Sequence, residues 1–209
     1  MSGGAGTGDR GRRAEPPRAE PERAEPGRWP ELEAALAVVN RDVRATLPGQ
    51  EPLILMVTPA PDEAAGTYGS SSSYGSCGSY GGQEVYVAMA DGRSHGSPVH
   101  TDDLAEDAPR EPGDAATVLS VVAEAAQETV MELLWQVWPL CREHGTGVHP
   151  RPAGTSEDWY PGETAAGGPP VWWCRGGRTG DCHDASPIGE LADTLPGKER
   201  RALRRGRRR

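Results

Sequence analysis

Glycine and proline gather in parts of this chain and limit where a folded core can form. The 209 residues include 28 Gly and 20 Pro, a share that approaches the range of low-complexity chains. The stretches left to build a core are 31–58, 84–145 and 170–195. A chain of this length usually forms one domain, here with at most a small appendage. Because the core is modest in size, we expect a metal ion or a disulfide to help stabilise it.

Both ends of the chain are predicted to be disordered. Residues 1–29 repeat the unit Arg-Ala-Glu-Pro, and the proline in each unit disfavours a helix. The other end, 196–209, is basic: from Lys198 onward eight basic residues stand against one Glu, a net charge of +7. Since the whole chain carries −9, the other 197 residues carry −16. An acidic body with a basic tail can present that tail to nucleic acid or to an acidic partner.

Two helices are predicted in the region 30–139. The first, Pro30–Leu47, starts with a proline and has acidic residues in its first turn, which suit the positive end of a helix dipole. The second runs from the N-cap Asp114 to Trp138 and stops at Pro139. Each helix is expected to bury one face, because apolar residues recur at helical spacing. These residues are Leu32, Leu36, Val39, Val43 and Leu47 in the first helix, and Val118, Val122, Ala125, Thr129, Leu133 and Val137 in the second.

Strands are predicted at Leu53–Val57, a continuous apolar run, and at Glu84–Ala90, where apolar and polar residues alternate. Asp91-Gly92 is typical of a hairpin turn, so a third short strand is expected near Ser97–Thr101. The Gly/Ser/Tyr stretch 62–83 is expected to be a flexible loop between the first two strands. The region is therefore predicted to be an α+β core, with a small antiparallel sheet packed against two helices.

Cysteine and histidine residues in the segment 140–195 have the spacing of metal ligands. Two residues separate Cys141 from His144, which lets both side chains turn toward one ion. Cys174 follows at the end of a predicted strand, Val171–Cys174, and a Gly-rich loop joins it to the pair Cys182-His183. Zn²⁺ favours thiolate and imidazole ligands, and four of them close a structural site. The segment is therefore predicted to be zinc-ribbon-like and to hold one structural Zn²⁺.

The fourth ligand, after Cys141, His144 and Cys174, can be either His183 or Cys182. The pattern Trp-Pro-x-Cys-x-x-His, then Trp-Trp-Cys, a Gly-rich loop, His and Ile-Gly-Glu-Leu, covers about residues 135–191. It resembles the pattern of small uncharacterised proteins of high-GC Gram-positive bacteria. The resemblance favours His183 over Cys182 and implies no activity.

The chain is expected to be a soluble, cytoplasmic protein. No stretch approaches the roughly 18 consecutive apolar residues of a membrane helix. The Arg-rich N-terminus has no apolar core like that of a secretory signal peptide. Cys77, Cys141, Cys174 and Cys182 are therefore expected in a reducing compartment, where clustered cysteines favour metal binding over disulfides.

Three hypotheses of function follow. The leading one is a non-enzymatic protein that is stabilised by zinc and acts by binding an unidentified protein partner. The second is a zinc-ribbon protein that binds nucleic acid through its basic tail. The third is a zinc-dependent hydrolase, which would need an open coordination position and a base such as Glu143. The arginines that would serve the second hypothesis are Arg200, Arg201, Arg204, Arg205, Arg207, Arg208 and Arg209.

Overall fold

The computed structural model describes residues 21–59, 83–99, 114–158, 168–177 and 180–206. Cys77 and all but the last residue of the predicted loop 62–83 lie outside these ranges. The described residues form helices and two three-stranded antiparallel sheets, ordered β1-β2-β3 and β4-β5-β6. The fold is α+β, as predicted, with two sheets in place of one. No helix in the described part is long and apolar enough to cross a membrane.

The first sheet contains β1 (Glu22–Arg23), β2 (Ile54–Pro59) and β3 (Gln83–Ala88), with β2 in the centre. For residues 21–29, β1 corrects the prediction of disorder. Ala24 N donates to Leu55 O at 3.0 Å, and Trp29 is buried. The Pro-rich sequence does avoid helix, but its extended backbone suits a short edge strand that pairs with β2.

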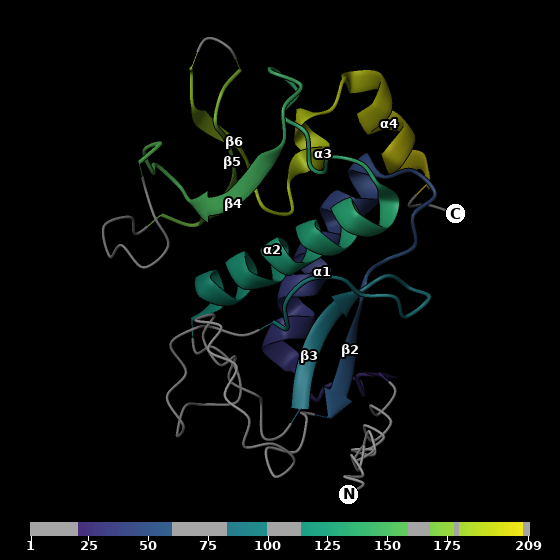
Figure 1. The fold of residues 1–209 in the computed structure, drawn as a ribbon. Coiled ribbons are helices and arrows are strands. Elements are labelled where there is room, and N and C mark those ends of the chain that lie inside the picture. Colours follow the sequence, from purple (N-terminus) through teal and green to yellow (C-terminus); the bar gives the residue numbers. More distant parts are fainter. Residues whose placement is uncertain (1–20, 60–82, 100–113, 159–167, 178–179, 207–209) are drawn as a thin grey trace, which may run out of the picture.

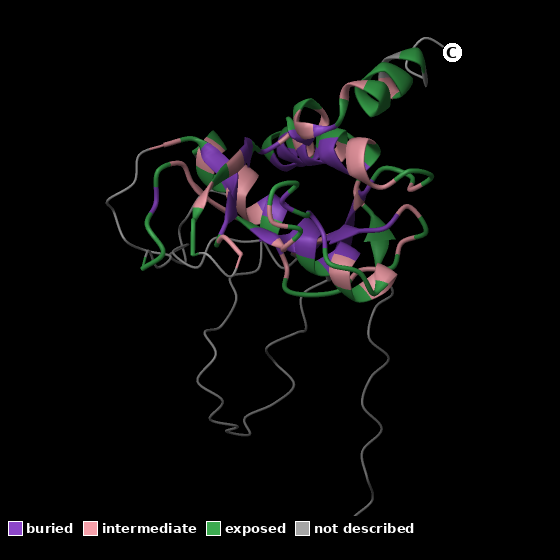
Figure 2. Cartoon of the chain, turned by 90° about the horizontal axis from the view of Figure 1, so that it is seen from above, coloured by how far each residue is buried: buried purple, intermediate pink, exposed green. Residues whose placement is uncertain are grey.

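Helices α1 (Pro30–Thr46) and α2 (Ala115–Leu134) pack against each other, and α2 crosses the molecule between the two sheets (Figure 1). Both begin as predicted: Pro30 lies in the first turn of α1, and the Asp114 side chain accepts a hydrogen bond from Thr117 N at 2.8 Å. Figure 2 shows the buried residues concentrated where the helices and sheets face one another. The predicted apolar stripe of α1 is part of this core.

The second helix is four residues shorter than predicted. It ends at Leu134, because the next residue, Trp135, has a left-handed backbone with φ 53° and breaks the helix. Val137, which was predicted on the buried face, is exposed as a result, whereas Trp138 is buried. Pro139 therefore lies beyond the end of the helix and does not define it.

The turn after β3 forms as predicted, but a third strand does not follow within the described residues. Met89 N donates to Arg93 O at 2.8 Å, which closes the turn at Asp91-Gly92. Residues 97–99 are not part of a strand, and 100–101 lie outside the described ranges. This segment contacts both α2 and β3: Ser97 N donates to the Glu128 carboxylate at 3.3 Å, and Val99 N donates to Val85 O at 2.6 Å.

The second sheet contains β4 (Val148–Pro152), β5 (Pro170–Cys174) and β6 (His183–Pro187), with β5 in the centre. The strand predicted at Val171–Cys174 is confirmed, and all of β5 is buried. Its two tryptophans are covered on opposite sides. Trp172 packs edge-on against Trp138, with ring centroids 5.5 Å apart, and the Arg151 guanidinium lies 3.9 Å from the Trp173 ring centroid.

Two helices end the described chain, α3 (Leu191–Thr194) and α4 (Gly197–Gly206). For residues 197–206, the second corrects the prediction of a disordered tail at 196–209. Its sequence is rich in Arg, with Lys, Glu, Ala and Leu, which are all good helix formers. Figure 2 shows α4 projecting from the body.

Candidate metal centre

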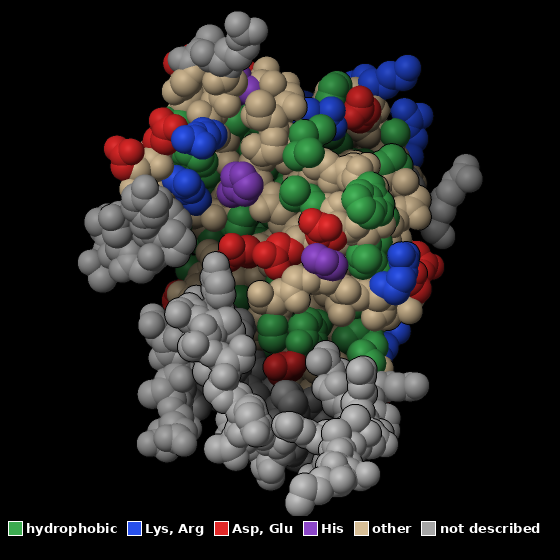
Figure 3. Space-filling view, in the orientation of Figure 1, with side chains coloured by type: hydrophobic (Ala, Val, Ile, Leu, Met, Phe, Trp, Pro, Cys, Tyr) green, Lys and Arg blue, Asp and Glu red, His purple; other side chains and the backbone are tan. Residues whose placement is uncertain are grey.

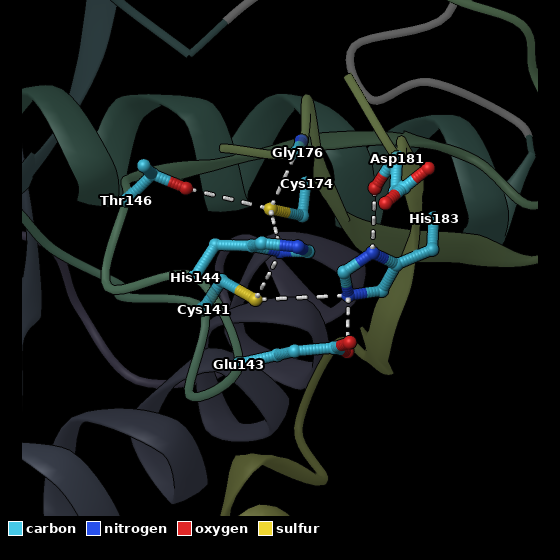
Figure 4. A network of polar contacts seen from close by, with 8 residues as sticks. All are labelled: Cys141, Glu143, His144, Thr146, Cys174, Gly176, Asp181 and His183. Atoms are coloured by element: carbon cyan, nitrogen blue, oxygen red, sulfur yellow. Dashed lines mark hydrogen bonds and ion pairs between the residues drawn. The ribbon is translucent and has the colours of Figure 1, made fainter. Parts of the chain in front are cut away.

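The side chains of Cys141, His144, Cys174 and His183 converge at one end of the second sheet (Figure 4). Their ligand atoms, two thiol sulfurs and two ring nitrogens, all lie within 4.8 Å of one another. Cys141, His144 and Cys174 are the three ligands that the sequence predicted. Of the two candidates for the fourth ligand, the structure brings His183 to them. These four residues are close enough to hold a metal ion.

Three distances between the ligand atoms match those around a tetrahedral metal. The Cys141 sulfur lies 3.6 Å from His144 Nδ1 and 3.6 Å from His183 Nε2, and the Cys174 sulfur lies 3.6 Å from His144 Nδ1. Bond lengths of about 2.3 Å to sulfur and about 2.0–2.1 Å to nitrogen place tetrahedral ligands of Zn²⁺ about 3.6 Å apart. A metal could therefore be bound with little rearrangement of the ligands.

A tight turn presents Cys141 and His144 on the same side. Gly145 N donates to Cys141 O and Cys141 N donates to Thr146 O, both at 2.8 Å. Gly145 has φ 65°, a left-handed backbone that glycine adopts without steric cost. The backbone thus folds back within a few residues, as the two-residue spacing predicts.

A bulge in β6 brings the fourth ligand into place. Trp172 pairs with Ser186, but Trp173 pairs with Asp184, so Ala185 is an extra residue between them. The register shifts by one, and Cys174 pairs with His183. In the unshifted register Cys174 would face Asp184. The alternation of residues along a strand does not predict a β-bulge. Here the bulge places His183, in place of Asp184, opposite Cys174.

Hydrogen bonds to the ligands orient them further (Figure 4). Gly176 N donates to the Cys174 sulfur at 3.3 Å, and the Thr146 hydroxyl lies 3.5 Å from the same sulfur. His183 Nδ1 lies 3.2 Å from Asp181 O, which leaves Nε2 directed at Cys141. A backbone carbonyl on the other ring nitrogen is the usual way in which proteins hold a metal-binding histidine.

Gly176 cannot be replaced by another residue without rearrangement. It has φ 83°, and a Cβ there would lie 2.7 Å from Asp181 N. The Gly-rich loop between β5 and β6 thus allows the two backbones to approach closely, near the amide that contacts Cys174.

The sulfur side of the cluster is buried and the histidine side is half-buried. Burial raises the pKa of the Cys141 thiol, and the neighbouring Cys174 raises it further, against backbone hydrogen bonds from His144 and Glu143 that lower it. A cation at the centre would oppose this effect, since it stabilises the thiolate form.

Asp42 of α1, which sequence reasoning missed, ties the sheet that holds the cluster to the helices. Its carboxylate accepts hydrogen bonds from Trp172 Nε1 at 2.7 Å, Gly189 N at 2.6 Å and Leu191 N at 2.8 Å. Burial raises the pKa of Asp42 to about 6, although these hydrogen bonds lower it. The sequence did contain a signal, because Asp42 lies next to Val43 on the apolar stripe of its helix.

Gln127 of α2 is a second missed residue with a similar role. Its side-chain amide donates to Trp138 O and Val148 O, at the two ends of the segment that carries Cys141 and His144. Its carbonyl oxygen lies 3.3 Å from His149 Nδ1. One buried amide on α2 thus helps to fix the position of this turn.

The other predicted site residues are not members of the cluster. Cys182 is exposed and does not belong to the cluster. Glu143, the base of the hydrolase hypothesis, is 73% exposed and lies 3.7 Å from His183 Nε2. Of the arginines assigned to nucleic-acid binding, 200, 201, 204 and 205 lie in α4, and 207–209 lie outside the described residues.

Comparison of the chain with models of protein families, with curated proteins and with solved structures found no match. The site therefore has to be interpreted from its own geometry.

Proposed function

We propose that this is a non-enzymatic cytoplasmic protein in which one structural Zn²⁺ stabilises a zinc-ribbon-like sheet, and which acts by binding another protein. The observation that carries the proposal is the convergence of two cysteines and two histidines, with three sulfur–nitrogen distances of 3.6 Å. The ligands would be Cys141, His144, Cys174 and His183.

The donor set favours Zn²⁺ over harder cations. Thiolate and imidazole are ligands of zinc, whereas Mg²⁺ and Ca²⁺ prefer oxygen. Two thiolates also balance the charge of a divalent ion. A neutral centre can lie beside buried Cys141 and Cys174 without leaving a net charge in the interior.

A structural role is favoured over hydrolysis because four protein ligands are at hand. Catalytic zinc normally has three protein ligands and keeps one position for water. Here His183 occupies the place that a reacting water would need. The Glu143 carboxylate lies 3.7 Å from His183 Nε2, the ligand atom itself, and would thus be next to a centre whose four positions are already filled by protein ligands.

Metal content tests the proposal directly. Protein purified without added zinc should contain one equivalent of Zn²⁺ by mass spectrometry, and Cys141→Ser should lose it. Substituted Co²⁺ should show the visible absorption of a tetrahedral site with sulfur ligands. Cys182→Ser is the matched control, because this exposed cysteine next to His183 should be dispensable. Wild-type protein without metal, or a Cys141→Ser variant with full metal content, would contradict the proposal.

Nucleic-acid binding is the second candidate, and the composition of α4 favours it. Five basic residues and one Glu give this ten-residue helix a net charge of +4. Such a helix can contact phosphates, and its affinity would fall steeply with salt. Salt-dependent binding of DNA or RNA that disappears on deletion of residues 198–209 would support this candidate.

A further inference from the structure

Three exposed apolar side chains lie together in the segment between α2 and β4. Trp135 is 89% exposed, Val137 53% and Leu140 48%. We call these three residues, with Arg142 and α4, the knuckle face. Figure 3 shows hydrophobic side chains gathered over the end of α2, with Lys and Arg side chains beside them near α4. Exposed apolar groups that cluster in this way mark interaction surfaces more often than scattered ones do.

Trp135 is unfavourable at its position in two independent respects. It is the one described residue other than glycine with a positive φ, and a bulky side chain is strained in that conformation. Its indole is also almost wholly in water. Glycine would end α2 with less strain and without an exposed ring. Neither the backbone conformation nor the exposure to water at position 135 therefore explains why the residue is tryptophan.

The segment that carries Trp135 is held firmly from the inside. Trp138 is buried, and its indole N–H donates to the Thr46 hydroxyl at 2.8 Å. Leu140 forms an isolated bridge with Gly147, and the side chain of Val137 lies directly over Gly147. The outward side chains are thus presented by a fixed backbone. A preformed surface loses little entropy when a partner binds.

Positive charge borders this apolar surface. Arg142 lies two residues after Leu140 and is 3.6 Å from Glu199 of α4, which places the basic helix beside the turn. Even with this ion pair, α4 keeps a surplus of four positive charges, and Arg200 and Arg201 are exposed. The rest of the chain is acidic. The local charge therefore complements an acidic ligand.

We propose that the knuckle face docks an acidic segment of a partner protein, with Trp135 inserted among that segment's apolar side chains and α4 facing its carboxylates. This inference rests on the proposed role in protein binding and specifies the partner's chemistry. Val137 and Leu140 favour a protein over nucleic acid, because aliphatic side chains offer no stacking surface to bases. A two-fold pairing of identical copies would set one basic α4 against another, which disfavours a second copy.

Two synthetic peptides with the same leucine spacing test the proposal, one carrying Glu and the other Lys at all remaining positions. Each is titrated into the zinc-loaded full chain, and amide and indole N–H resonances are followed by NMR. The Glu peptide should shift the Trp135 indole and the amides of α4, and the Lys peptide should not. Trp135→Gly should weaken binding by about tenfold or more, as expected for a tryptophan at the centre of an interface.

Stability separates a binding role from a structural one. Trp135→Gly should melt at or above the wild-type temperature and keep its metal, because the strain at this position is relieved. The double variant Arg200→Glu/Arg201→Glu should also fail to bind the Glu peptide. The control Arg23→Glu, in β1, should bind it as the wild type does.

Several results would overturn the inference. They are an unshifted Trp135 indole at saturating Glu peptide, equal binding of both peptides, preferential displacement by a single-stranded oligonucleotide, and self-association that Trp135→Gly abolishes. Metal content is measured on the same samples. A sample that contains zinc but does not bind the Glu peptide contradicts this inference alone, whereas a sample without zinc contradicts the proposed metal centre.

Discussion

The two sheets of this protein are held in different ways. The sheet β1-β2-β3 contributes Leu55, Val85 and Val87 to an apolar core shared with α1 and α2. The sheet β4-β5-β6 contributes Val148 and Trp172 to the same core, but it also has buried polar links to the helices, through Asp42 and Gln127, and the Cys/His cluster at its end. Both sheets are thus held by apolar contacts, and the second is held in addition by a few specific polar groups and by its cluster of ligands.

This difference has a physical reason. A β2 or β3 side chain that is lost leaves its neighbours in place, and the cost follows the area and volume removed. A lost ligand or buried carboxylate leaves its partners buried without a counterpart, which costs more than the contact itself contributed. We therefore expect graded responses to apolar truncations and abrupt ones to loss of a ligand or buried polar group of the second sheet.

The largest effect is expected from removing the metal. Chelation, or Cys174→Ser, should destabilise the second sheet by more than about 3 kcal/mol, because the free energy of metal binding is also free energy of folding. Hydrogen exchange should then rise in β4, β5 and β6 while β2 and β3 stay protected. An equal loss of protection in both sheets would show that they are one cooperative unit.

A truncation in the apolar core should cost about 2–5 kcal/mol without affecting the metal. Leu32→Ala is the suitable change, since Leu32 is fully buried in α1. The midpoint of urea unfolding should fall while zinc content stays at one equivalent. If Leu32→Ala also releases zinc, the centre depends on the core more closely than the contacts indicate.

Asp42→Asn should cost about 1–3 kcal/mol at neutral pH, because at least one buried N–H loses its acceptor. The cost should also depend on pH. Folding raises the pKa of Asp42 from 3.8 to about 6, so between these values the folded protein holds a proton that the unfolded chain has released. Wild-type stability from this group is greatest below pH 4 and falls as pH rises toward 6.

Unfolding curves of wild type and Asp42→Asn across pH 4–7 measure this dependence. The difference in free energy of unfolding should grow by up to about 3 kcal/mol as pH is lowered from 7 to 4. If it shrinks instead, the three N–H donors stabilise the carboxylate more than burial destabilises it.

The smallest effect is expected from Glu143→Gln. This side chain is exposed and lies 3.7 Å from His183 Nε2, so stability should change by less than about 0.5 kcal/mol. Zinc content should be unchanged. A metal-dependent hydrolysis that disappears in this variant, with folding intact, would support the hydrolase hypothesis and contradict a purely structural centre.

Local sequence determined the elements whose causes are local. Pro30 and Asp114 mark the starts of α1 and α2, a short apolar run gives β5, and the spacing of Cys141 and His144 gives the ligand turn. Propensity, capping and periodicity act over a few residues, so they can be read from the chain without its fold.

Tertiary structure decided what depends on distant neighbours. The bulge at Ala185 placed His183 opposite Cys174. The spacing of the residues alone did not decide whether His183 or Cys182 is the fourth ligand. Pairing with β2 ordered residues that composition predicted to be disordered, and the left-handed Trp135 ended α2 before its proline. Packing across the molecule sets the strand register, the pairing at the sheet edge and the hydrogen bonds that three segments donate to Asp42. No local sequence pattern encodes these features.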